Sequence, residues 1–217
     1  MKKVIVINGS PRRRGNTHRM ADSVVAGIQS RLLEVDVKWY DLYELNYSGC
    51  RSCFACKAKN GGSYGRCAID DDLSAVLDQI AGADCLIVAS PVYLMDISAQ
   101  TRSFAERLCF SLGSYEKGYR SLAKKKMPVV TVYTMNALPE MAPYGAFDNI
   151  EYFLGHIFSP PRRVCAFNTY QFRDYTKYVV ETFSELEKAC WRDVHFKEDL
   201  QAAFDAGKDI AGQLQKG

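Results

Sequence analysis

Two segments of the chain carry residue types that could do chemistry. The first, Asn8–Thr17, reads N-G-S-P-R-R-R-G-N-T and follows the apolar run Val4–Ile7. A buried strand that turns into a helix start leaves backbone N–H groups and the positive end of the helix dipole free to bind a phosphate. Hydroxyl, amide and guanidinium side chains add donors and charge. The expected phosphate ligands are Ser10, Arg12, Gly15, Asn16 and Thr17.

The order of residues in this loop excludes two common phosphate motifs. It lacks the G-x-x-x-x-G-K-[ST] pattern of nucleoside-triphosphate loops and the G-x-G-x-x-G pattern of dinucleotide turns. The alternative interpretation needs no ligand: Ser10 and Pro11 make a turn, and Asn16 or Thr17 caps a helix.

The second segment is a cysteine motif with the spacing C-x2-C-x2-C-x10-C. Its members are Cys50, Cys53, Cys56 and Cys67. Four thiolates can bind a [4Fe–4S] cluster or a zinc ion. The third alternative is a set of free thiols, which would be either a structural remnant or a redox pair such as Cys53 and Cys56. Three nearby cations are expected to lower the thiol pKa values: Lys57, Lys59 and Arg66.

Strand-like and helix-like segments alternate along the chain. Apolar, β-branched runs predict strands at 4–7, 35–40, 85–89, 128–133 and 163–168. Helical patterns predict helices at 17–33, 73–81, 99–112 and 146–156, and two more between 175 and 215. This alternation predicts an α/β fold with a doubly wound, five-stranded parallel sheet in the order 2-1-3-4-5 and helices on both faces.

Two further loops should approach the phosphate loop, because ligands bind such sheets outside the carboxyl ends of the strands. The loop 90–98 carries consecutive apolar residues that would cover a flat aromatic ligand; alternatively, they plug the core or a subunit interface. The loop 134–138 should approach from the other side. The expected ligand contacts are Pro91, Val92, Tyr93, Leu94, Thr134, Met135 and Asn136.

These motifs together resemble the flavodoxin-like NAD(P)H-dependent FMN reductases. The resemblance rests on G-S-P-R-x-x-G-N-T, on S-P-V-Y at 90–93 and on the segments 98–100 and 104–108, and it covers roughly the first 135 residues. The family more often has Lys at Arg102 and Asp at Glu106. The cysteine motif resembles that of the iron–sulfur flavoproteins, a branch of this family, although its last gap of ten residues is longer than that branch leads one to expect.

The resemblance implies a flavodoxin-like fold with FMN held by the three loops. Electrons would pass from NAD(P)H through FMN to a small-molecule or protein acceptor, and no catalytic side chain is required because the flavin carries the chemistry. One alternative is an iron–sulfur flavoprotein that carries electrons through FMN and a [4Fe–4S] cluster. Another is a zinc-bearing, non-redox binding module. The resemblance also implies a homodimer or homotetramer.

Composition limits the class of protein further. The chain has 217 residues, 47% of them hydrophobic, and a formal charge of +3, which argues for neither nucleic-acid nor membrane binding. No apolar run approaches a membrane span and no signal peptide is evident, so a cytoplasmic location with reduced cysteines is expected. We expect a single domain over 1–217, with a cysteine-rich loop at 47–69 and a helical C-terminal extension from about 175.

Overall fold

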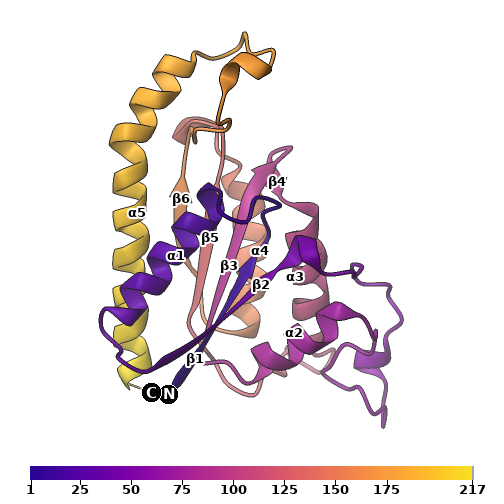
Figure 1. Ribbon diagram of the computed structural model, residues 1–217. Helices are drawn as coiled ribbons and strands as arrows, with labels where there is room; N and C mark the ends of the chain where they lie inside the picture. The colour runs from indigo at the N-terminus through magenta and orange to yellow at the C-terminus, as the bar shows by residue number, and fades with distance from the viewer. Residues whose placement is uncertain (217) are drawn as a thin grey trace.

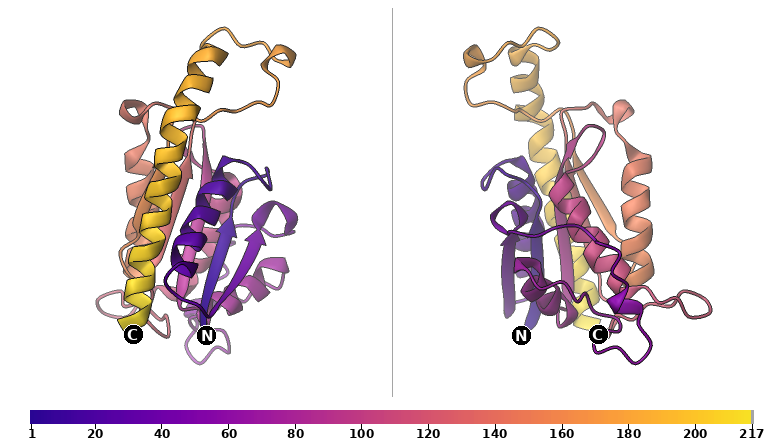
Figure 2. Two further views of the ribbon diagram at one scale, coloured as in Figure 1. Left: turned by 60° about the vertical axis from the view of Figure 1, so that its left-hand side comes forward. Right: turned by 90° about the vertical axis from the view of Figure 1, so that its right-hand side faces the viewer.

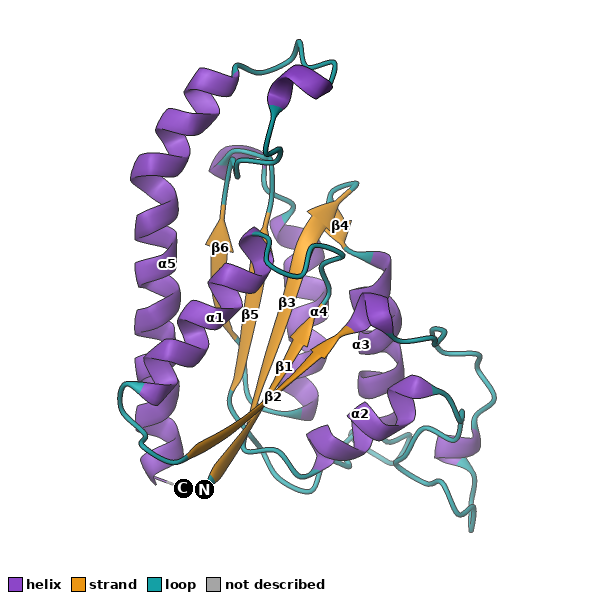
Figure 3. Cartoon of the chain, viewed as in Figure 1, coloured by secondary structure: helices purple, strands orange, loops and turns teal. Residues whose placement is uncertain are grey.

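The core of the protein is a parallel sheet, seen in a computed structural model that describes residues 1–216. The sheet has the strand order β2-β1-β3-β5-β6 (Figures 1 and 3). Its parallel strands are β1 (Lys2–Asn8), β2 (Val35–Asp41), β3 (Cys85–Tyr93), β5 (Val129–Thr134) and β6 (Arg162–Ala166). Counted along the chain, these five strands have the predicted order 2-1-3-4-5, so the predicted fold class is confirmed.

The sheet contains one strand that the sequence analysis did not predict. β4 (Asp96–Ile97) pairs antiparallel with the end of β3, with Val92 opposite Ile97 and Tyr93 opposite Asp96. The predicted loop 90–98 is therefore a hairpin. The β-branched and aromatic residues Val92 and Tyr93 favour extended backbone, so β3 continues beyond its predicted end at residue 89.

Helices cover both faces of the sheet (Figure 2). α1 (Asn16–Gln29) and α5 (Glu185–Lys216) pack against each other and on one face. The opposite face carries α2 (Asp72–Ala81), α3 (Ala99–Leu112) and α4 (Tyr144–Ile157). Within residues 1–216, no helix combines the length and the apolar content of a membrane span.

Alternation along β1 divides its side chains between two cores. Val4 and Val6 join the core under α1 and α5, whereas Ile5 and Ile7 join the core under α2, α3 and α4. All four side chains have no solvent exposure. A central strand covered on both faces explains why this run is continuously apolar.

The prediction of two helices between 175 and 215 is wrong. A single helix of 32 residues, α5, begins at Glu185, and only the short 3-10 turn Tyr175–Lys177 precedes it. Two glycines let α1 and α5 approach closely: a Cβ at Gly27 would lie 2.0 Å from the Phe204 carbonyl oxygen, and one at Gly207 would lie 2.1 Å from that of Val24. α5 packs along α1, and the segment before α5 projects past the carboxyl ends of the strands (Figure 1).

Candidate flavin site and cysteine pocket

The loops after β1, β3 and β5 meet at the carboxyl edge of the sheet and line one cleft. The loop after β6 joins them. The lining residues are Ser10, Arg12, Gly15, Asn16, Thr17, Pro91, Val92, Tyr93, Thr134, Met135, Asn136, Thr169 and Gln171. All predicted ligand residues except Leu94 are among them, so the topology brings together residues that are far apart in the sequence.

The first loop ends in an uncapped helix start. Gly15 is the N-cap of α1 and offers no side-chain hydrogen bond to the first turn. The loop is instead held from within. The Ser10 N–H donates to Asn8 Oδ1 (3.2 Å), and the Arg12 N–H donates to Ser10 Oγ (3.2 Å). Because these bonds use other N–H groups, the first-turn amides of α1 remain available to an anion in the cleft.

Gly9 fixes the position of this loop against α3. A Cβ at Gly9 would lie 1.8 Å from Thr101 Oγ1, so only glycine allows this approach. Ser98 Oγ donates to the Gly9 carbonyl oxygen (2.8 Å), and the same hydroxyl caps α3 by accepting from the Thr101 N–H. The phosphate loop and the start of α3 are thereby one rigid unit.

The loop after β6 was not predicted to contribute to the site. Arg12 Nη1 donates to the Gln171 carbonyl oxygen (2.6 Å), and Asn16 Nδ2 donates to that of Tyr170 (3.0 Å). Thr169 also lines the cleft. The predicted strand 163–168 could have indicated this contribution, because the last parallel strand ends at the same edge of the sheet as the others.

A contact between hydroxyls joins the first loop to the third. Thr17 Oγ1 and Thr134 Oγ1 are 2.7 Å apart, and both side chains are buried. Met135, which follows Thr134, is also buried, whereas Asn136 is exposed. The third loop therefore forms a fixed wall of the cleft beside the helix start.

Leu94 lies outside the cleft, contrary to the sequence interpretation. Leu94 and Met95 form the tip of the β3–β4 hairpin with φ angles of 50° and 63°. A two-residue hairpin turn of this kind requires positive φ at both central residues, and it points Leu94 into solvent, where it is 100% exposed. Tyr93, which is 44% exposed, stays at the rim of the cleft.

The four clustered cysteines line a second pocket, which shares no lining residue with the cleft. They come from the segment between β2 and α2, and Arg107 of α3 completes the lining. Burial raises the pKa of Cys56, and the nearby charge of Lys57 does not overcome this effect. The expectation that nearby cations lower the thiol pKa is thus wrong for Cys56. The charge of Arg66 is compensated by a carboxylate, because Arg66 forms an ion pair with Asp78 (2.8 Å).

Arg107 anchors the cysteine segment to the helix layer. Its side chain is completely buried, and its Nε donates to Cys67 Sγ (2.8 Å). Its Nη1 and Nη2 donate to the two carboxylate oxygens of Asp71 (2.8 and 3.1 Å). Burial alone would raise the pKa of Asp71, but the hydrogen bonds and charge of Arg107 outweigh it and hold that pKa below its ordinary value. The sequence interpretation noted Arg107 only as part of a family motif.

The cysteine pocket offers four thiols to a metal centre. Cys50, Cys53, Cys56 and Cys67 all line it, with the buried guanidinium of Arg107 beside them. Among residues 1–216, no group of three His, Cys, Asp or Glu side chains stands in place to hold a metal ion. Thiolates are ligands of iron–sulfur clusters and of zinc, so the donor chemistry fits either centre.

Comparison with known proteins establishes the family. Residues 2–143 match the family of NADPH-dependent FMN reductases, and the chain belongs to that family. The resemblance inferred from the three loops is therefore confirmed.

Individual relatives agree with this assignment. The chain is 32% identical over 106 residues to an iron–sulfur flavoprotein of Archaeoglobus fulgidus, covering 49% of this chain and 45% of that protein. It is 28% identical to the NADH-dependent FMN reductase SfnF of Pseudomonas putida, covering 71% and 81%. The NAD(P)H:quinone oxidoreductase of Methanothermobacter marburgensis has the same fold, with a TM-score of 0.66 at 14% identity over 96% of both chains. The chain spans about half the length of three iron–sulfur flavoproteins it matches, 45% to 51%, and 71% of a second one from Archaeoglobus fulgidus.

Proposed function

We propose that this protein is an FMN-dependent NAD(P)H oxidoreductase whose flavin binds in the cleft at the carboxyl edge of the sheet. The observation that carries the proposal is the convergence of three separate loops around an uncapped helix start. Family membership supports the same cofactor and the same electron donor.

The phosphate end of the site would be the start of α1. Backbone N–H groups of its first turn, with the hydroxyls of Ser10 and Thr17, would donate to the phosphate oxygens. Arg12 and Asn16 reach the neighbouring carbonyl oxygens of 170–171, so on binding they would exchange neutral acceptors for an anionic one. Charge-assisted hydrogen bonds are the stronger kind, which favours this exchange.

The ring end of the site would lie between the hairpin and the third loop. Pro91, Val92 and Tyr93 would contact one side of the ring, and Thr134 and Met135 the other. The hairpin backbone is fixed by its pairing with β4, so its amides hold a defined position beside the polar edge of the ring.

FMN supplies hydride acceptance and electron release when it is bound, and the protein supplies orientation and binding. Ser10 and Thr17 would fix the phosphate, and Tyr93 at the rim would border the open side of the cleft. A reduced nicotinamide and an acceptor would use this open side in turn. The acceptor is a small molecule or a protein.

Anaerobic mixing tests the proposed activity. Protein loaded with FMN is mixed with NADH or NADPH, and the oxidised flavin absorbance is followed. We expect loss of this absorbance with at least one of the two nicotinamides. Persistence of the oxidised flavin spectrum with both donors would refute the proposal.

The cysteine pocket favours a second candidate function, in which the protein also carries electrons through a [4Fe–4S] cluster. Cys50, Cys53, Cys56 and Cys67 would hold the cluster, and Arg107 would donate to the Cys67 sulfur. Several relatives are named iron–sulfur flavoproteins. Electron transfer between a cluster in this pocket and the flavin would make the protein an electron carrier as well as a reductase.

Iron and sulfide assays on protein purified without oxygen decide this second candidate. We expect about four irons per chain, lost in Cys56→Ser and retained in Cys190→Ser, which changes an exposed cysteine outside the pocket. Iron-free protein, also after anaerobic reconstitution, would leave the four cysteines as thiols. The predicted homodimer or homotetramer and the cytoplasmic location stay predictions.

A further inference from the structure

A cavity of about 560 Å³ opens at the amino edge of the sheet, opposite the flavin cleft. It lies among the ends of α2 and α3, the segment 122–127 and the end of the cysteine segment. Ala83 lines this cavity just before β3 begins, and Pro91 lines the flavin cleft near the end of β3. Eight residues of extended chain at about 3.3 Å per residue separate the two by roughly 26 Å. The cavity is therefore separate from the site proposed for FMN, and its volume is typical of small-molecule sites.

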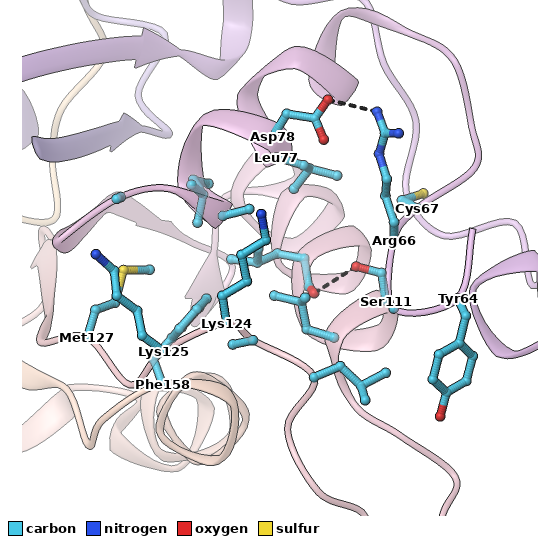
Figure 4. A pocket seen from close by; sticks show the side chains of 18 residues that line it. Tyr64, Arg66, Cys67, Leu77, Asp78, Ser111, Lys124, Lys125, Met127 and Phe158 are labelled. Carbon is cyan, nitrogen blue, oxygen red and sulfur yellow. Dashed lines mark hydrogen bonds and ion pairs between the residues drawn. The ribbon is translucent and has the colours of Figure 1, made fainter. Parts of the chain in front are cut away.

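The floor of the cavity is apolar and buried. It consists of side chains that are at most 3% exposed: Ile80, Ala83, Leu108, Met127 and Phe158. These residues belong to the main hydrophobic core of that face of the sheet. Figure 4 shows Met127 and Phe158 on one side of the cavity and Cys67 and Arg66 on the other. Such a floor suits a hydrocarbon or aromatic body.

The rim of the cavity is cationic. Arg66, Lys124 and Lys125 line it, and Asp78 is the carboxylate that lines it with them. Arg66 is neutralised by Asp78 (2.8 Å), and Lys125 is neutralised by Asp84 (2.7 Å). Lys124 forms no ion pair with any of residues 1–216 and stands exposed at the opening. The rim therefore keeps one uncompensated positive charge above an apolar floor.

We propose that this cavity binds an amphipathic organic anion, with its apolar body on the floor and its carboxylate, sulfonate or phosphate at Lys124. Cys67 lines both this cavity and the cysteine pocket. A ligand in this cavity would therefore contact the cysteine segment, and it would not reach the flavin cleft. The site is independent of FMN binding.

Calorimetric titration with anilinonaphthalene sulfonate tests the proposal in protein saturated with FMN. We expect one probe per chain in the wild type. Ala123→Trp places an indole in the cavity and should weaken binding at least about tenfold, because the floor can no longer be reached. Ala75→Trp is the matched control, since Ala75 is exposed on α2 outside the cavity.

A charge variant keeps the test decisive if the tryptophan perturbs folding. Lys124→Glu should weaken the probe about fivefold, whereas Lys59→Glu, an equal charge change outside the cavity, should leave its affinity unchanged. Absence of probe binding to the wild type, or equal binding to wild type and Lys124→Glu, would overturn the proposal. So would binding of the probe to FMN-free protein only, which would place the probe in the flavin cleft. Flavin content is measured in parallel, so failure here is distinguishable from failure of the proposed function.

Discussion

The phosphate loop and the cysteine segment are held in opposite ways. The phosphate loop follows a buried strand and precedes a helix, and short-range bonds such as that from the Ser10 N–H to Asn8 Oδ1 shape it. The cysteine segment has almost no regular structure, and long-range bonds to α3 and its end hold it. Arg107, forty residues after Cys67, donates to the Cys67 sulfur, and Lys57 donates to the Gly113 carbonyl oxygen. The shape of the phosphate loop thus comes largely from its own residues, whereas the cysteine segment depends on long-range contacts, of which that of Arg107 is completely buried.

This difference predicts which property of the protein a substitution in each site would change. Changes in the phosphate loop should reduce ligand binding while the fold persists, because the loop lies at the surface of an intact sheet. Changes at Arg107 or its partner should reduce stability, because they leave a buried charge without compensation. The predictions below test this contrast.

The largest expected effect is on stability at the cysteine segment. Asp71→Asn keeps the capacity to cap α2 but removes the charge that neutralises Arg107. We expect the free energy of unfolding to fall by about 3 kcal/mol, measured by urea denaturation. The control Asp78→Asn breaks an exposed ion pair on the same helix and should cost less than about 1 kcal/mol. Equal losses in the two variants would contradict the assigned role of Arg107.

The next effect is on flavin affinity. Ser10→Ala combined with Thr17→Ala removes two hydroxyl donors to a charged group and should weaken FMN binding about hundredfold. Flavin fluorescence quenching measures the affinity, and circular dichroism checks the fold. Thr182→Ala, an exposed threonine away from the cleft, is the control. Unchanged FMN affinity in the double variant would move the phosphate elsewhere.

A smaller effect distinguishes two neighbours in the hairpin. Tyr93→Ala should weaken FMN about tenfold, because a stacking and burial contact is lost. Leu94→Ala should leave the affinity unchanged, since Leu94 points into solvent at the hairpin tip. The same titration serves both variants. A larger loss of FMN affinity in Leu94→Ala than in Tyr93→Ala would support the sequence-based assignment of Leu94 to the ring site.

Much of the carboxyl-edge site could be predicted from the sequence because strand ends determine it. An apolar run such as Val4–Ile7 fixes a strand, and parallel strands must end at one edge, so the loops that follow must meet. Leu94 could not be placed, because its direction depends on a two-residue turn with positive φ that Leu and Met rarely adopt.

The cysteine segment was less predictable for a different reason. The contact of Arg107 with Cys67 is a tertiary contact between an irregular segment and α3, and no periodicity encodes it. Likewise, the close packing of α5 against α1 depends on Gly27 and Gly207, and no local pattern in either helix shows its partner. In both cases, the structure depends on tertiary contacts that the local sequence pattern does not show.

The smallest expected effect is a pH dependence of stability. Arg107 holds the pKa of Asp71 below its ordinary value, so the folded protein binds this proton less tightly than the unfolded chain. The contribution of Asp71 is present above about pH 4 and is lost as the pH falls through its folded-state pKa. The stability difference between wild type and Asp71→Asn should therefore shrink in acid. A difference that grows as the pH falls would reverse the sign argued here.

Binding of FMN by the residues of the cleft alone is the central claim, and one comparison of visible spectra tests it most directly. Wild type and Cys67→Ser are purified without oxygen, and both are supplied with FMN. The account predicts the same flavin bands in both proteins, because the cysteine pocket lies away from the cleft. Absence of flavin bands in the wild type, or their loss in Cys67→Ser while the fold is intact, would contradict it.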